Sequence, residues 1–101
     1  LYCTGSLYRP KAPATQKRAA VLCAHGHWAN ARFMGHTDAQ MKIELEKKAE
    51  VHPIGGQYFL QAIPVQLARM GCVAFFYDML GYADGGPLTS ALIHGFAKQR
   101  P

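Results

Sequence analysis

The amino-acid sequence predicts an α/β fold with a mostly parallel sheet and crossover helices. Two unbroken apolar runs carry this prediction, Ala19–Ala24 and Cys72–Tyr77. Each run suits a strand buried on both faces, as in a parallel sheet, and each stops at a polar turn. The segment between the runs is long enough for a crossover, and its last part has a helical pattern. Parallel strands point the same way, so the turns that follow them should meet at one edge of the sheet.

The length of the chain limits it to one domain or part of one. It has 101 residues, of which 50% are hydrophobic. Two core strands are few, because a sheet usually has about five or six. We therefore expect residues 1–101 to be the amino-terminal part of a larger domain. Apolar sheet and helix surfaces left open in such a fragment favour self-association.

The formal net charge of +5 does not indicate a nucleic-acid or membrane partner. No arginine-rich helix, zinc-finger spacing or RNA-binding aromatic motif accompanies the 11 Lys and Arg residues. No stretch approaches the roughly 20 apolar residues of a membrane span. The three cysteines form no Cys-x-x-Cys pair, so neither a disulfide framework nor a thiolate zinc site is predicted.

The first half of the chain contains two further predicted elements. An edge strand is expected within Leu1–Arg9, broken at Gly5, before a loop at Lys11–Arg18. A helix is expected to begin at Thr37, because Thr37 and Gln40 have the spacing of a capping box. The segment 51–56, which contains Gly55-Gly56, is expected to end this helix as a loop.

The second half contains the stronger helical pattern. Gln57–Met70 has its apolar residues on one face, with Gly71 at the position that ends a helix. Pro64 lies inside this pattern and predicts either a kink or the start of a second helix. A last helix is expected within Leu88–Phe96.

The sharpest functional signal is His25-Gly26-His27-Trp28, directly after the first apolar run. Glycine allows a tight turn there, so that main-chain N–H groups face a ligand and stabilise an oxyanion during acyl transfer. The alternative is a structural turn in which His25 is hydrogen-bonded to nearby backbone. Trp28 beside Tyr82 likewise has two interpretations, as the lining of an acyl or sugar pocket or as a cover for the end of the sheet.

Other kinds of site fit the sequence less well. A metal site of His25 and His27, completed by His36 or Asp38, lacks a His-Glu-x-x-His or comparable spacing. Gly55-Gly56 is not part of a phosphate-binding glycine motif after a strand. Neither a metal nor another cofactor is predicted.

Three segments carry a resemblance to a known family: Ala20–Asn30, Gln66–Val73 and Tyr77–Asp84. Together they resemble the amino-terminal half of an α/β-hydrolase. The groups to which they are most similar are the acetyl xylan esterase-like and dienelactone hydrolase-like enzymes. The resemblance implies a serine-dependent hydrolase whose substrate is a small-molecule or carbohydrate ester of a carboxylic acid.

The resemblance also assigns roles at the expected sheet edge. The His-Gly pair falls at the family's oxyanion loop, so the backbone N–H groups of His27 and Trp28 are the implied oxyanion donors. Asp78 and Gly81 match the family's Asp-x-x-Gly turn, in which the Asp is structural. His25 and Gly26 are implied to have structural roles at the same edge.

The family's catalytic serine has no counterpart in the sequence. That serine lies in a Gly-x-Ser-x-Gly turn, and the acid and the histidine follow it along the chain. The only serines here, Ser6 and Ser90, have different neighbours. We therefore expect a fragment that ends before the catalytic serine and is inactive alone. The alternative is a small non-catalytic α/β binding module.

Overall fold

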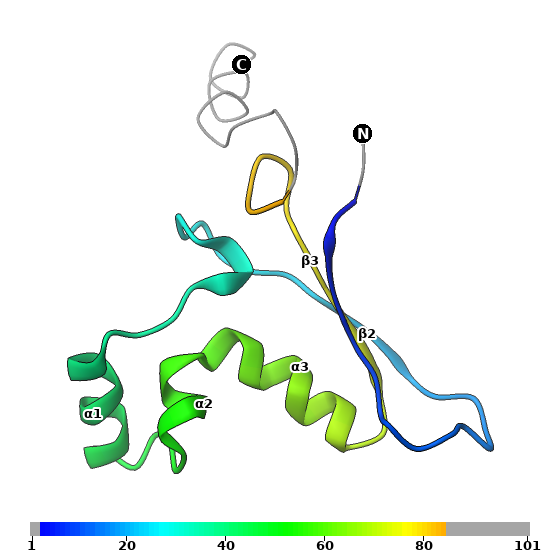
Figure 1. Ribbon diagram of the computed structural model, residues 1–101, viewed down its shortest axis with the longest axis horizontal. Helices are drawn as coiled ribbons and strands as arrows, with labels where there is room; N and C mark the ends of the chain where they lie inside the picture. The colour runs from blue at the N-terminus through cyan, green and yellow to red at the C-terminus, as the bar shows by residue number, and fades with distance from the viewer. Residues whose placement is uncertain (1–2, 85–101) are drawn as a thin grey trace, which may run out of the picture.

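The computed structural model describes residues 3–84, which form a small sheet with helices (Figure 1). The strands are β1 (Gly5–Tyr8), β2 (Ala20–Cys23) and β3 (Val73–Tyr77). The helices are α1 (Asp38–Glu46), α2 (Pro53–Gln57) and α3 (Phe59–Arg69), and a 3-10 turn, η1, covers Ala31–Phe33. The helix expected at Leu88–Phe96 lies outside the described residues.

The strand order in the sheet is β1-β3-β2. β2 and β3 are parallel, with Ala20 opposite Val73 and Cys23 opposite Phe76, as the two apolar runs predict. β1 pairs with β3 in the antiparallel direction and begins at Gly5, the residue expected to break it. The α/β class is therefore confirmed, but the sheet within residues 3–84 is mixed and not mostly parallel.

Only one face of this sheet is covered within the described part of the chain. The register places Ser6, Phe76 and Cys23 in one row, and the row contains the buried ring of Phe76. The neighbouring row, on the opposite face, consists of Leu7, Phe75 and Leu22. Leu22 is 75% exposed. The prediction of strands buried on both faces is thus wrong for these residues, because α3 packs against one face alone (Figure 1).

Helix α3 runs without interruption through Pro64, so the second helix that could have begun at this proline is not found. The proline ring is fully buried, together with Leu60 on the same face. The helix ends where predicted: Gly71 has a φ of 99°, a left-handed conformation that glycine adopts without steric cost.

The break in the helical pattern lies earlier than expected, at Tyr58. Residues 53–57, expected to be mostly loop, form the short helix α2, with Pro53 in its first turn. Proline fits this position because its ring fixes φ and the missing N–H would have no partner in the helix. The backbone of Tyr58 then departs from helical geometry, with φ −114° and ψ 51°, and redirects the chain into α3.

Helix α1 begins as predicted, with a capping box at Thr37. The Thr37 hydroxyl accepts a hydrogen bond from the Gln40 N–H, and the Gln40 side chain accepts one from the Thr37 N–H. The helix has no buried residue and packs mainly on α2. It ends at Glu46, before Ala49, because Lys48 adopts a left-handed conformation with φ 57°.

Replacing Thr37 with alanine is expected to fray α1 by about 1 kcal/mol, the usual contribution of such a cap. The loss should be local, since α1 buries no side chain and contributes little to the core. Hydrogen exchange of the α1 amides should accelerate, whereas the amides of β3 should exchange as in the unmodified chain. Unchanged exchange in α1 would show that the capping box does not stabilise this helix.

Between α1 and α2, the Glu50 carboxylate accepts hydrogen bonds from the backbone N–H groups of Val51 (2.7 Å) and His52 (3.2 Å). These bonds hold the pKa of Glu50 below its usual value. A lowered pKa in the folded state means that the interaction stabilises the turn at neutral pH and is lost as the pH falls. We expect the protection factor of the Val51 amide, its exchange relative to an unstructured amide at the same pH, to fall as the pH drops below the ordinary pKa of glutamate, about 4.3. Glu50→Gln should remove this pH dependence.

Candidate functional site

The turns that follow β2 and β3 lie together at the carboxyl edge of the parallel pair. β2 ends at Cys23 and β3 at Tyr77, one residue apart in register. A hydrogen bond joins the two turns directly, from the Met79 N–H to His25 Nε2 at 3.2 Å. The structure therefore places the His25–Trp28 and Asp78–Gly81 turns side by side.

His25 is a buried link between these turns. Its Nδ1–H donates to the Gly26 carbonyl at 2.7 Å while its Nε2 accepts from Met79. This pattern fits a neutral ring with the proton on Nδ1, because a carbonyl only accepts and an N–H only donates. The ring packs against Phe76 and Tyr82, at centroid distances of 6.4 and 5.3 Å. With both nitrogens occupied, His25 holds the turn and is not placed as a general base.

The residues expected to face a substrate separate into two groups. Tyr82 packs edge-on against His27 at a centroid distance of 6.0 Å and against His25. Trp28 packs edge-on against Phe59, the first residue of α3, at 6.1 Å. Trp28 thus covers the start of α3, and Tyr82 covers the two histidines.

Gly26 provides the space into which the Trp28 ring packs. A Cβ atom on Gly26 would lie 2.8 Å from that ring. Its φ is not in the left-handed region, unlike that of Gly81 (φ 81°) in the second turn. Glycine is therefore needed at position 26 because the indole ring occupies the space of a side chain, and not because of a special backbone angle.

Gly26→Ala is expected to displace the Trp28 ring, which is the movable partner in this contact. Trp28 is the only tryptophan, so its fluorescence reports the displacement without interference. We expect a red-shifted emission maximum, because a ring that leaves Phe59 enters water. Gly55→Ala, where an added Cβ would meet only the flexible side chain of Glu50, is the control and should leave the emission maximum unchanged. An identical spectrum for Gly26→Ala would contradict the packing described here.

Asp78, the first residue of the second turn, joins groups from two other segments of the chain. It is buried, and its Oδ1 forms an ion pair with Arg32 Nη1; among the described residues neither atom has another partner. Its Oδ2 accepts from the Thr4 hydroxyl at 2.8 Å, and its N–H donates to the Thr4 carbonyl at 2.8 Å. Asp78 therefore joins η1, the residue before β1 and the end of β3.

Arg32 is the residue at this edge that the sequence did not single out. It is only 5% exposed, and it contacts Ser6 Oγ (3.1 Å) and Asp84 Oδ2 (2.6 Å) besides Asp78. Burial lowers the pKa of Arg32, but the hydrogen bonds and charges of the two aspartates outweigh burial and raise the pKa above its usual value. The guanidinium therefore stays charged. Nothing in the local sequence distinguishes Arg32 from an exposed loop arginine.

The described residues do not assemble a catalytic triad. Ser6 is the only serine among them, and its hydroxyl accepts from Arg32 instead of facing a histidine. His36 Nδ1–H donates to the Gly56 carbonyl at 3.0 Å, and its ring stacks on Phe59. Within residues 3–84 no three His, Cys, Asp or Glu side chains gather in a way that could hold a metal ion.

Comparison of the chain with protein-family models, with curated proteins and with solved structures found no match. In the part of the chain that the structure describes, no helix is both long and apolar enough to cross a membrane.

Proposed function

We propose that this chain is the amino-terminal part of a serine-dependent α/β-hydrolase that acts on carboxylic esters. The observation that carries the proposal is the parallel pair β2–β3, whose two turns are joined by the His25–Met79 hydrogen bond. Ligands of open α/β sheets bind at this edge, outside the carboxyl ends of the strands. The α/β class and the shared edge agree with the family resemblance.

In this proposal the turn after β2 binds the carbonyl oxygen of the ester. The backbone N–H groups of His27 and Trp28 would donate to that oxygen as it becomes negative in the tetrahedral intermediate. Such donors are effective when they are held in place before the reaction. His25 supplies that support, because it is buried and bonded to both turns.

The serine, acid and histidine of the reaction would come from chain that follows residue 101. The family order places the serine turn after the oxyanion loop, with the acid and the histidine later still. Within residues 3–84, Arg32 and Asp78 would fix the loop on which this part of the site is built. Trp28 and Tyr82, at the same edge, would contact the acyl or alcohol group of the ester.

One observation favours a second candidate, a non-catalytic α/β binding module. The single described serine accepts a hydrogen bond from a buried arginine, so residues 3–84 offer no serine nucleophile with an adjacent base. A binding module needs neither a nucleophile nor a base.

Hydrolysis of a short-chain chromogenic acetate discriminates the two candidates. The assay compares the 101-residue chain with the longest natural reading frame that contains it. Activity only in the longer protein, abolished by a serine-directed covalent inhibitor, supports the hydrolase. Inhibitor-sensitive activity in the 101-residue chain would show that the nucleophile is misplaced in our proposal. Absence of hydrolysis in both proteins would favour the binding module.

A further inference from the structure

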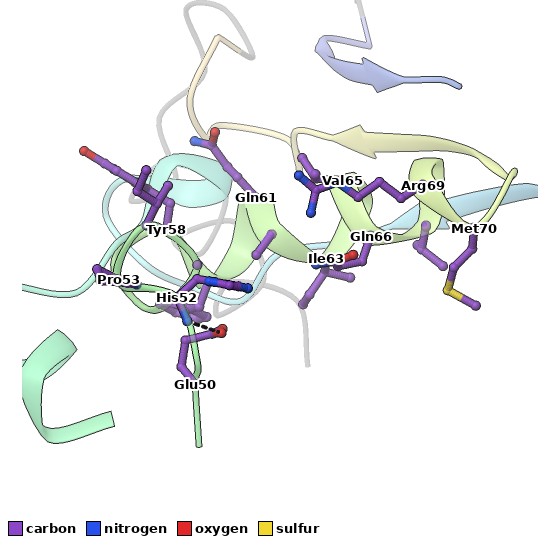
Figure 2. A pocket seen from close by; sticks show the side chains of 15 residues that line it. Glu50, His52, Pro53, Tyr58, Gln61, Ile63, Val65, Gln66, Arg69 and Met70 are labelled. Carbon is purple, nitrogen blue, oxygen red and sulfur yellow. Dashed lines mark hydrogen bonds between the residues drawn. The ribbon is translucent and has the colours of Figure 1, made fainter. Parts of the chain in front are cut away.

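The outer face of α2 and α3, turned away from the sheet, contains an apolar groove (Figure 2). The groove has a volume of about 920 Å³ and is lined by 15 residues. Side chains such as Ile54, Ile63 and Met70 line it and are largely exposed, with Ile54 at 75% and Met70 at 78%. A helix that only linked two strands would present polar residues on this face, so the apolar lining requires a separate explanation.

The groove differs from a typical small-molecule site. Such sites enclose most of a ligand and place a few polar groups around its centre. Here the apolar side chains stand open to solvent, and the charged residues lie at the two ends. Exposed apolar surface with a charged rim is typical of a protein interface.

The charges at the two ends have opposite signs. Glu50 and His52 lie at the end formed by α2, and Arg69 and Met70 lie at the end where α3 stops (Figure 2). Glu50 is fixed in position by its hydrogen bonds to the backbone of Val51 and His52. The lining therefore has one acidic residue, Glu50, at one end and one basic residue, Arg69, at the other, and α3 between them is 11 residues long.

We propose that this groove binds the same groove of a second copy of the chain, with the two α3 helices antiparallel. A twofold axis near the middle of α3 places Glu50 of each copy beside the partner's Arg69 and forms both ion pairs at once. Interfaces with this symmetry are self-complementary by construction. The opposite charges at the two ends make this groove complementary to itself, and this is the observation that selects a second copy as the occupant.

The same axis explains where the apolar residues lie. Ile63 and Gln66, near the middle of α3, would meet their equivalents in the partner. Met70, at the end of α3, would lie against the partner's Ile54 and Phe59. The most exposed apolar side chains of the groove would thereby be buried in pairs.

The size of the groove predicts a weak dimer. Its 15 lining residues are fewer than the roughly 20–30 residues that each partner contributes to a standard stable interface. We expect a dissociation constant on the order of 10–100 µM, which corresponds to the low end of interface sizes.

Sedimentation velocity of the 101-residue chain over a concentration series tests the proposal. Ile63→Asp should weaken dimerisation at least about a hundredfold, because it places a charge at the centre of the interface. Glu50→Arg and Arg69→Glu should each weaken it about tenfold, since each change reverses two exposed ion pairs per dimer. The double variant Glu50→Arg/Arg69→Glu should recover the original dissociation constant.

A mixture of the two single variants provides the decisive arm. Arginines at both ends of one variant match glutamates at both ends of the other, so the mixture should form heterodimers with about the original dissociation constant, although each variant alone pairs with itself about tenfold more weakly. Leu22→Asp, on the uncovered face of the sheet, is the matched control and should leave dimerisation unchanged. Circular dichroism melts verify that each variant is folded.

Three outcomes would overturn the proposal. One is a chain that stays monomeric throughout the concentration series. Another is a mixture of charge variants that does not associate. The third is association that Leu22→Asp abolishes and Ile63→Asp does not, which would assign it to the sheet. None of these outcomes bears on ester hydrolysis, which is measured separately.

Discussion

Replacing Arg32 with methionine is expected to destabilise the chain by about 3–5 kcal/mol, the usual effect of removing one partner of a buried ion pair. Methionine is long enough to fill much of the same space, so the main effect is electrostatic. The Asp78 carboxylate, which pairs with Arg32 through Oδ1, would remain buried without its counter-charge. The total stability of a domain is commonly about 5–15 kcal/mol, so this loss should be evident in urea unfolding.

The two aspartates that contact Arg32 provide the matched comparison. Asp84→Asn removes the outer ion pair, whose carboxylate side chain is 64% exposed, and should cost no more than about 1 kcal/mol. Asp78→Asn removes the buried ion pair. The double variant Asp78→Asn/Arg32→Met should lose less stability than the sum of the losses in the two single variants. Equal effects of Asp84→Asn and Arg32→Met would contradict the assignment of Asp78 as the principal partner.

Phe76→Ala is expected to cost about 3–5 kcal/mol, the range for removing a buried aromatic ring. Phe76 is 2% exposed and is the larger of the two bulkiest fully buried side chains, Phe76 and Pro64. It also lies 6.4 Å from the ring of His25, so its loss should loosen the link between the two turns. Thermal unfolding followed by circular dichroism measures the first effect, and hydrogen exchange at Met79 measures the second.

Leu22→Ala, one position away in register and on the other face, is the control for Phe76→Ala. Leu22 is exposed within the described structure, so its truncation should change stability by less than about 0.5 kcal/mol. A loss comparable to that of Phe76→Ala would mean that this face of the sheet is covered in solution. It would contradict the one-sided sheet described here.

The elements that the sequence predicted correctly depend on short-range chemistry. The apolar runs predicted β2 and β3, and because the pair is linked by a helix they also predicted the parallel direction. The capping box at Thr37 and the glycine at position 71 each satisfy backbone groups within one turn of a helix. These features depend on a few neighbouring residues, so a sequence contains enough information to place them.

The features that the sequence did not predict depend on distant contacts. The apolar run at β2 shows that its residues are hydrophobic, not which face another element covers. Whether Leu22 is buried depends on packing partners far along the chain. Similarly, α3 tolerates Pro64 because the ring lies in the core, a tertiary contact that outweighs the local helix penalty.

The candidate site also contains some residues whose positions the sequence predicts and others whose positions depend on distant contacts. The positions of His25 and Asp78 follow from the ends of two parallel strands, which the sequence predicts. The burial of Arg32 does not, because its partners Ser6, Asp78 and Asp84 lie far from it in sequence. Trp28 and Tyr82, predicted as neighbours, each find a different aromatic partner, and aromatic packing of this kind is not visible in residue spacing.

The most direct test of the central claim is to find the residue that a serine-directed fluorophosphonate labels in the longest natural reading frame. Peptide mass mapping after labelling identifies that residue. The proposal predicts one labelled serine, within a Gly-x-Ser-x-Gly sequence after residue 101, and slower labelling in a Gly26→Ala variant whose oxyanion turn is disturbed. Label on Ser6 or Ser90, or a folded protein that takes up no label, would contradict it.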